Sequence, residues 1–100
     1  MILQEKLTDF EKWLREEEKS DATIEKYLRD VERFLHFLVG RELTKEAVLE
    51  YKAQLGESYA VSGANSMIAA INSFLRFCGA DSMCVKQFRV QRQTFCSEDI

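Results

Sequence analysis

The sequence predicts an all-α domain built as a four-helix bundle, in which two helical hairpins pack across each other. Three observations carry this prediction. The 100 residues include no Pro and only four Gly, and these are the residues that most often interrupt helices. Apolar residues recur with a helical period in four separate stretches. Ser20 and Thr44 stand where two of those stretches begin, as helix-capping residues do. The length fits a single domain.

The first helix is expected over residues 2–19. Its apolar stripe is marked by residues at i, i+4, i+7 and i+11: Leu3, Leu7, Phe10 and Leu14. Trp13 flanks this stripe and is expected to be partly exposed. The acidic run Glu16-Glu17-Glu18 reads most simply as the solvated end of the helix.

The second helix is expected to follow the Ser20 cap and to stop at Gly40. It carries the strongest periodic signal in the chain, formed by Ile24, Tyr27, Leu28, Val31, Phe34, Leu35 and Leu38. Burying one such side chain contributes about 1.5–3 kcal/mol before the loss of entropy is subtracted. This stripe is therefore predicted to form the centre of the core.

The third helix is expected to begin after Thr44 and to end near Gly56, with Ala47, Val48, Tyr51 and Leu55 facing the core. The fourth helix is expected over residues 61–78, ending at Gly79. Its apolar positions are Ala64, Met67, Ile68, Ile71, Phe74, Leu75 and Cys78. Beyond residue 80 the helical period is lost, so residues 81–95 are predicted to be partly extended. Residues 97–100 look like the start of a further helix.

Composition limits the classes of function. Hydrophobic residues make up 46% and charged residues 31%, which is ordinary for a soluble globular protein. The formal net charge of −3 argues mildly against nucleic acid as a partner. Between residues 76 and 95, however, the charge balance is reversed: Asp81 is the one acidic residue, against the basic residues Arg76, Lys86, Arg89 and Arg92. A nucleic-acid function must therefore rest on local basic patches.

Residues suited to covalent or metal chemistry are scarce. The three cysteines are odd in number and form no C-x-x-C pair, which fits a reducing interior. The one histidine, His36, favours a surface or structural role over catalysis, and a zinc site of ordinary spacing is not expected. No cofactor is predicted. The chain has neither a bilayer-length apolar run nor a signal peptide, so the cytoplasm is the expected location.

Two helix faces stand out as candidate binding surfaces. On the second helix, Thr23, Lys26, Asp30 and Arg33 share one side and Arg29 is adjacent. Basic residues and a hydroxyl near a helix N-terminus suit phosphate. The competing interpretation is a solvated face with ion pairs such as Glu25–Arg29, and charge alone favours it.

The second candidate face, on the fourth helix, consists of Ser62, Asn65, Ser66, Ala69, Asn72, Ser73 and Arg76. Short polar side chains permit close approach to a DNA groove, and Asn can pair with an adenine edge. A close helix–helix contact explains the small residues equally well. Lys86, Arg89 and Arg92 fit either a segment that follows a phosphate backbone or a solvated tail.

The order of several short patterns resembles a known family. The patterns are Ser20-x-x-Thr23-Ile24-x-x-Tyr27-x-x-Asp30-Val31-x-x-Phe34-x-x-Phe37-Leu38, then Leu43-Thr44, then Tyr59-Ala60-Val61-Ser62, then Ile68-Ala69-Ala70-Ile71-Asn72-Ser73-Phe74-Leu75-Arg76-Phe77. Together they resemble the N-terminal core-binding (SAM-like) domain of tyrosine recombinases of the phage-integrase type. On this resemblance, residues 1–80 are the DNA-binding domain, and residues 81–100 are a linker toward a catalytic domain that lies outside the chain.

The resemblance implies one half of a clamp around duplex DNA, used in DNA integration or excision. Thr23, Lys26, Arg29 and Arg33 would contact the backbone; Ser62, Asn65, Ser66, Asn72 and Arg76 would contact a groove; Lys86, Arg89 and Arg92 would follow the DNA. The catalytic domain would form the other half and supply the tyrosine nucleophile, so this chain would not be an enzyme by itself. Members of the family assemble as tetramers on DNA, and the isolated domain is free to be monomeric. The chain departs from the family in its acidic balance and in the missing linker Pro.

Two alternatives stay open. The first is a helical protein–protein interaction module with no DNA function, which the acidic balance supports and for which Trp13 could serve as an anchor. The second is an autonomous enzyme, which ranks last because no nucleophile is paired with a base in the sequence.

Overall fold

The computed structural model describes residues 5–89. Its four α-helices are α1 (Glu5–Glu16), α2 (Asp21–Phe37), α3 (Lys45–Ser58) and α4 (Val61–Phe77), followed by the short 3₁₀-helix η1 (Asp81–Met83). No strand occurs between residues 5 and 89. The predicted all-α bundle is therefore confirmed.

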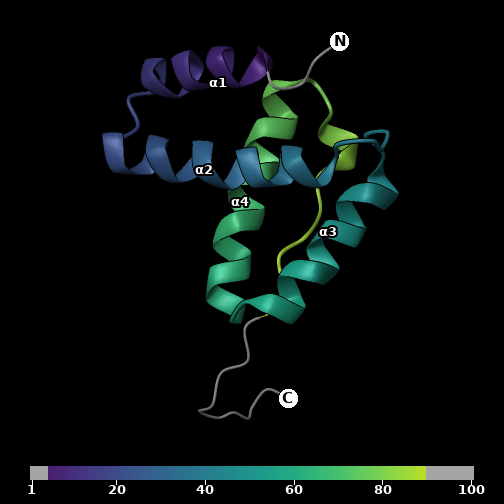
Figure 1. The fold of residues 1–100 in the computed structure, drawn as a ribbon. Coiled ribbons are helices and arrows are strands. Elements are labelled where there is room, and N and C mark those ends of the chain that lie inside the picture. Colours follow the sequence, from purple (N-terminus) through teal and green to yellow (C-terminus); the bar gives the residue numbers. More distant parts are fainter. Residues whose placement is uncertain (1–4, 90–100) are drawn as a thin grey trace.

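The helices form two hairpins that cross each other. α1 and α2 run antiparallel, and α3 and α4 form a second antiparallel pair, with α4 passing behind α2 (Figure 1). The most extensive contact in the bundle joins α2 to α4, while α1 packs on α2 and α3 packs on α4. The two candidate surfaces predicted from the sequence lie on these two central helices, α2 and α4.

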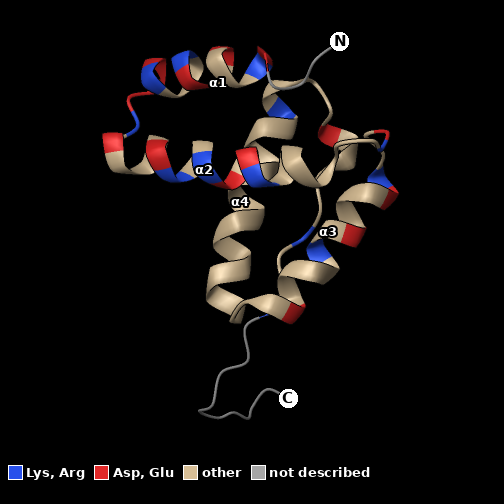
Figure 2. Ribbon diagram, in the orientation of Figure 1, with Lys and Arg blue, Asp and Glu red and all other residues tan. Residues whose placement is uncertain are grey.

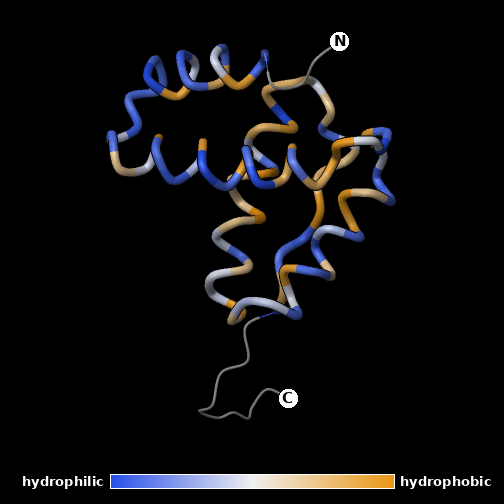
Figure 3. The backbone as a smooth tube through the Cα atoms, in the orientation of Figure 1, coloured by the Kyte–Doolittle hydropathy of each residue, from blue (hydrophilic) through white to orange (hydrophobic). Residues whose placement is uncertain are grey.

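The core lies where the hairpins cross. In Figure 3 the hydrophobic parts of α1 lie on the side that faces α2. Three phenylalanines from three different helices are fully buried, and the rings of Phe10 and Phe74 meet edge to face at 5.3 Å between centroids. The largest fully buried side chains are Phe10, Phe34, Phe74, Leu14, Ile24, Ile68, Ile71, Leu75, Val31 and Val48. The predicted stripe of α2 is buried except at Tyr27 and Leu28, which are half-buried.

The starts of α2 and α3 are capped as the sequence predicts. The Ser20 hydroxyl accepts a hydrogen bond from the Thr23 amide at 3.2 Å. The Thr44 hydroxyl accepts one from the Ala47 amide at 3.1 Å. Each cap satisfies one of the amides that the first helical turn leaves without a carbonyl partner.

α1 and α4 end in the same left-handed motif. After α4, Gly79 has φ of 80°. Its amide bonds to the Arg76 carbonyl at 3.0 Å, and the Ala80 amide bonds to the Leu75 carbonyl at 2.8 Å. This pair of bonds is the Schellman motif, in which glycine is usual. The predicted end of the fourth helix at Gly79 is confirmed.

The end of α1 differs from prediction, whereas the end of α3 agrees with it. α1 ends at Glu16 and not at residue 19, because Glu18 adopts the left-handed conformation and closes the helix. α3 ends near Gly56 as predicted, with Ser58 as its last residue. Gly56 has ordinary helical geometry, and it lies beneath the ring of Phe88. The helix predicted at residues 97–100 lies outside the described residues, as does the part of the predicted first helix before residue 5.

Candidate nucleic-acid interface

The polar side of α2 is only partly a solvated surface. Asp30, expected on this face, is 4% exposed. Its carboxylate forms an ion pair with the ammonium group of Lys26, one helical turn earlier. A carboxylate buried to this degree needs such a partner, because an isolated charge in the protein interior is costly. Lys26 is therefore engaged inside the domain.

Arg33 and Tyr59 connect α2 to the end of α3. The Arg33 guanidinium donates a hydrogen bond to the Tyr59 hydroxyl at 3.1 Å. Nearby, burial raises the pKa of the Tyr51 hydroxyl above its ordinary value of 10.0, and the charge of Arg33 acts in the opposite direction. Arg29 and Arg33 are both exposed on α2, but of the two only Arg33 has a side-chain hydrogen bond within residues 5–89. Arg29 is thus the predicted contact of this helix that is best placed to meet an outside anion.

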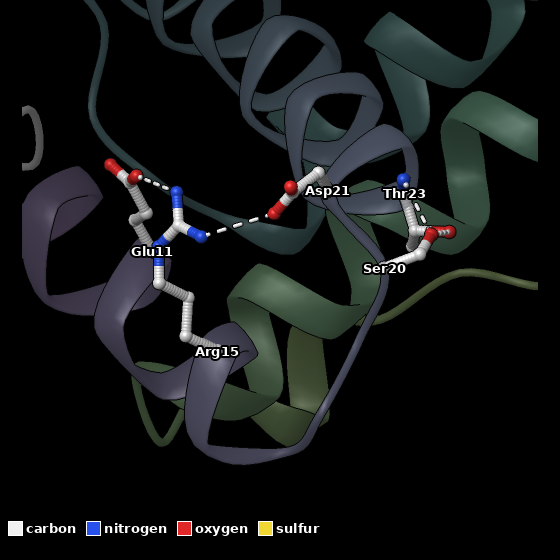
Figure 4. A network of polar contacts seen from close by, with 5 residues as sticks. All are labelled: Glu11, Arg15, Ser20, Asp21 and Thr23. Atoms are coloured by element: carbon white, nitrogen blue, oxygen red, sulfur yellow. Dashed lines mark hydrogen bonds and ion pairs between the residues drawn. The ribbon is translucent and has the colours of Figure 1, made fainter.

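The first turn of α2 already carries local polar contacts (Figure 4). The Ser20 hydroxyl donates to the Thr23 hydroxyl at 3.0 Å. Arg15 of α1 pairs with Glu11 at 2.9 Å and with Asp21 at 3.3 Å. Its hydrogen bond to Glu11 is the main cause that raises the pKa of Arg15. Because Asp21 supplies a carboxylate at the positive end of the α2 dipole, a phosphate at this helix N-terminus would meet a like charge.

The polar residues of α4 divide into two stripes. One stripe follows positions 62, 66, 69, 73 and 76, in which Ser62 and Arg76 are exposed and the middle three are half-buried. We call it the serine stripe (Ser62, Ser66, Ala69, Ser73 and Arg76). α4 contains no Asp or Glu, and Figure 2 draws it without acidic residues, in contrast to α1 and α2. The serine stripe is thus a partly exposed surface with short side chains and positive charge at one end.

The second stripe of α4 contains Asn65 and Asn72, which face the chain's own residues. Asn72 is 8% exposed, and its side-chain amide bonds to both the N–H and the C=O of Val85, at 3.0 and 2.7 Å. Asn65 bonds in the same way to Phe88, at 2.6 and 3.0 Å. Both residues were predicted to contact a DNA groove. Their amides are instead occupied within the domain, because the chain after α4 folds back along this helix.

Residues 84–88, here called the docked segment, lie against α3 and α4. Val85 is buried, and Phe88 is half-buried beneath the Lys52 ammonium group, which is 4.9 Å from the ring centroid. The Lys45 ammonium donates to the Cys84 carbonyl at 2.7 Å. Lys86 and Arg89 remain exposed. The sequence predicted extended backbone here but gave no sign that it would dock. Arg92 lies outside the described residues.

The other residues considered for chemistry or anchoring have structural surroundings. Trp13 is half-buried against Phe10 and Phe77, with ring centroids at 5.9 and 5.6 Å, so most of its surface is not free to anchor a partner. His36 is exposed. Burial raises the pKa of the Cys78 thiol above its ordinary value, which keeps it protonated and unreactive near neutral pH.

Residues 5–89 contain neither a cluster of metal-ligating side chains nor a membrane-crossing helix. That part of the chain contains no group of three or more His, Cys, Asp or Glu side chains placed to hold a metal ion. None of its helices combines the length and apolar character that crossing a membrane requires.

Comparison with known protein families identifies the class to which this chain belongs. The family model described as the phage integrase, N-terminal SAM-like domain matches residues 5–80. The match spans all four helices, so the chain belongs to this family and is a domain of the tyrosine recombinase (integrase) class. Comparison with curated proteins and with solved structures gave no match.

Proposed function

We propose that this chain holds duplex DNA at a recombination site, as one half of the clamp of a site-specific tyrosine recombinase. The covalent steps of integration or excision would belong to a catalytic domain formed by residues beyond this chain. Other protomers would join it on the DNA, as a tetramer in the full-length recombinase, and the isolated chain would be a monomer. The boundary between the DNA-holding domain and the linker would fall at residue 80, where the family match ends.

One observation carries the proposal: within a domain of this family, the exposed face of α4 is free of acidic residues. Duplex DNA carries about one negative charge per 1.7 Å of its axis, so an acidic face would repel it. Short serine side chains would let the helix approach the duplex closely. Arg76 at one end of the serine stripe would add a contact to phosphate.

The predicted contacts do not support the proposal equally. Arg29, Lys86 and Arg89 are exposed and suit phosphate directly. Lys26 would reach DNA only by sharing or breaking its ion pair with Asp30, whereas the exposed Arg33 guanidinium has further N–H donors beside the one bonded to Tyr59. Thr23 would contribute through the first turn of α2, beside its bond to Ser20. The predicted contact at Arg92 stays a prediction.

Serines of the serine stripe would lie toward a groove. Ser62 is exposed and Ser66 is half-buried, so Ser62 would make the closer approach. Asn65 and Asn72 are the weakest candidates for base contacts, because each would have to give up two hydrogen bonds to the docked segment. Such an exchange leaves buried backbone groups without partners, which is costly.

Fluorescence anisotropy tests the proposal with the 100-residue chain and a labelled mixed-sequence duplex of roughly 20 base pairs, about two helical turns. Affinity should fall linearly on a log–log plot against salt, with a slope of about −0.9 for each phosphate neutralised. Binding that is absent at low salt, or that does not depend on salt, would overturn the proposed function.

A further inference from the structure

The docked segment is held by two asparagines that act in the same way. Asn65 and Asn72 stand seven residues apart on α4, which is two helical turns on one face. The side-chain amide of each forms hydrogen bonds to a single residue. Asn72 binds the backbone of Val85 and Asn65 binds the backbone of Phe88, each through a pair of bonds within 2.6–3.0 Å. The pairing copies the bonds that a neighbouring strand would make. We call these two residues the asparagine clasp.

Side chains of the docked segment fit the surface beneath the clasp. Val85 is 7% exposed. The Phe88 ring covers Gly56 so closely that a Cβ built there would lie 2.8 Å from it. The Gln87 side chain adds a bond to the Asn65 carbonyl at 3.0 Å. The backbone of the segment is therefore fixed at both ends by partners on α3 and α4.

Two of the exposed residues in and directly after the docked segment are basic. Lys86 and Arg89 are both exposed, and each directly follows a residue that the clasp holds. A flexible chain loses conformational freedom when its cations settle on phosphates, whereas a backbone that is already fixed has lost that freedom on folding. By fixing the backbone, the clasp holds Lys86 and Arg89 at the surface of the domain, where they would otherwise belong to a flexible tail.

We propose that Asn65 and Asn72 are positioning residues, which preorganise Lys86 and Arg89 as a pair of phosphate contacts. The inference rests on the proposed function and gives this segment its part in it. The asparagines would act on DNA through the backbone of the docked segment, and not by reading bases. This differs from the groove contacts that the sequence predicted for the same two residues.

Amide hydrogen exchange, followed by NMR without DNA, tests the clasp itself. In the unaltered chain the amides of Val85 and Phe88 should exchange more slowly than those of an unstructured peptide. Asn72→Ala should speed exchange at Val85, and Asn65→Ala at Phe88, by at least about tenfold, because each variant loses both side-chain hydrogen bonds to that residue. Ser66→Ala, on the other stripe of the same helix, should change neither. Unprotected amides in the unaltered chain would overturn the inference.

Anisotropy with the same 20-base-pair mixed-sequence duplex, roughly two turns long, tests the positioning. Lys86→Ala with Arg89→Ala is measured in the unaltered chain and again in a chain carrying Asn65→Ala and Asn72→Ala, after circular dichroism has shown that the helices are retained. If the clasp positions the cations, the loss of affinity should be at least about threefold smaller in the second background, as for coupled sites.

Two results would contradict the positioning. Equal losses in both backgrounds would mean that the cations act without the clasp. If Asn72→Ala changes the DNA sequence preference while Lys86 and Arg89 contribute as much to affinity as before, Asn72 contacts bases directly. In both cases the chain still binds DNA, so the proposed function stands. Failure of the unaltered chain to bind DNA at low salt would overturn the proposed function and this inference together.

Discussion

Glu18 occupies a backbone position that glycine usually takes. Its φ is 62°, and the bonds from the Glu18 amide to the Arg15 carbonyl and from the Lys19 amide to the Leu14 carbonyl measure 3.0 and 3.2 Å. The same motif ends α4 with Gly79 in the equivalent place. A side chain in this conformation costs about 1–2 kcal/mol, which glycine avoids. One motif is thus strained and the other is relaxed.

This difference predicts opposite effects of exchanging the residues. Glu18→Gly should raise the free energy of unfolding by about 1 kcal/mol, and Gly79→Ala should lower it by about 1–2 kcal/mol. Urea denaturation followed by circular dichroism measures both. The account of the two helix ends fails if Glu18→Gly destabilises the chain or if Gly79→Ala leaves it unchanged.

Asp30 and Lys26 form the buried ion pair of α2. Asp30→Ala removes the carboxylate and leaves the half-buried Lys26 ammonium without it, which should lower the free energy of unfolding by about 1–3 kcal/mol. The matched control is Glu50→Ala, which removes one partner of the exposed Arg41–Glu50 pair and should change the stability far less. Thermal denaturation of both variants decides the matter, and equal losses would contradict the structural importance of Asp30.

Among the helices, local signals predict the ends better than they predict the contacts. α3 ends at Ser58, near the predicted Gly56, but the sequence did not indicate that Gly56 itself would pack beneath the ring of Phe88. The caps at Ser20 and Thr44 were predictable, since their partners are three residues away. The partners of Asn65 and Asn72 lie 23 and 13 residues further along the chain, beyond any local pattern. Spacing alone therefore placed both asparagines on the polar face of α4 but could not supply their partners.

Gly56 and Gly63 are a matched pair for testing this contact. An alanine Cβ at Gly63 would meet only Tyr59 Cβ at 3.9 Å, an ordinary contact, so Gly63→Ala should raise the free energy of unfolding by about 0.5–1 kcal/mol through helix propensity alone. At Gly56 the added methyl would collide with the Phe88 ring. Gly56→Ala should therefore displace Phe88 and speed exchange of its amide, while α3 itself remains helical.

NMR of the two glycine variants measures the outcome. Faster exchange at the Phe88 amide is expected in Gly56→Ala and not in Gly63→Ala. Retention of Phe88 protection in Gly56→Ala would show that the docked segment does not depend on the glycine surface.

Over the whole molecule, the distribution of charge matters more than its sum. The net charge of −3 predicts weak attraction to DNA, yet α1, α2 and α3 carry charged residues of both signs while α4 has none that is acidic (Figure 2). The sequence located this face by its short polar side chains, and the fold class by its periodicity. Which polar residues stay exposed on it depended on the path of the docked segment, which only the tertiary structure supplies.

A comparison of alanine variants at Arg29 and Lys12 distinguishes the effect of local charge on DNA binding from that of net charge. Both are exposed and each alanine substitution removes one positive charge, but Arg29 lies on α2 and Lys12 on α1. Arg29→Ala should lower the log–log salt slope of duplex binding by about 1, whereas Lys12→Ala should leave it nearly unchanged. Equal effects on anisotropy titrations would mean that the chain responds to its total charge and has no defined DNA face.

An NMR titration of the ¹⁵N-labelled chain with the mixed-sequence duplex tests whether α2, α4 and the docked segment form a DNA-holding surface. Amide shifts should concentrate at Arg29, along the serine stripe and in the docked segment, and the outer side of α1 should be unaffected. Shifts confined to α1 or the outer side of α3, or no shifts at low salt, would contradict a DNA-holding surface formed by α2, α4 and the docked segment.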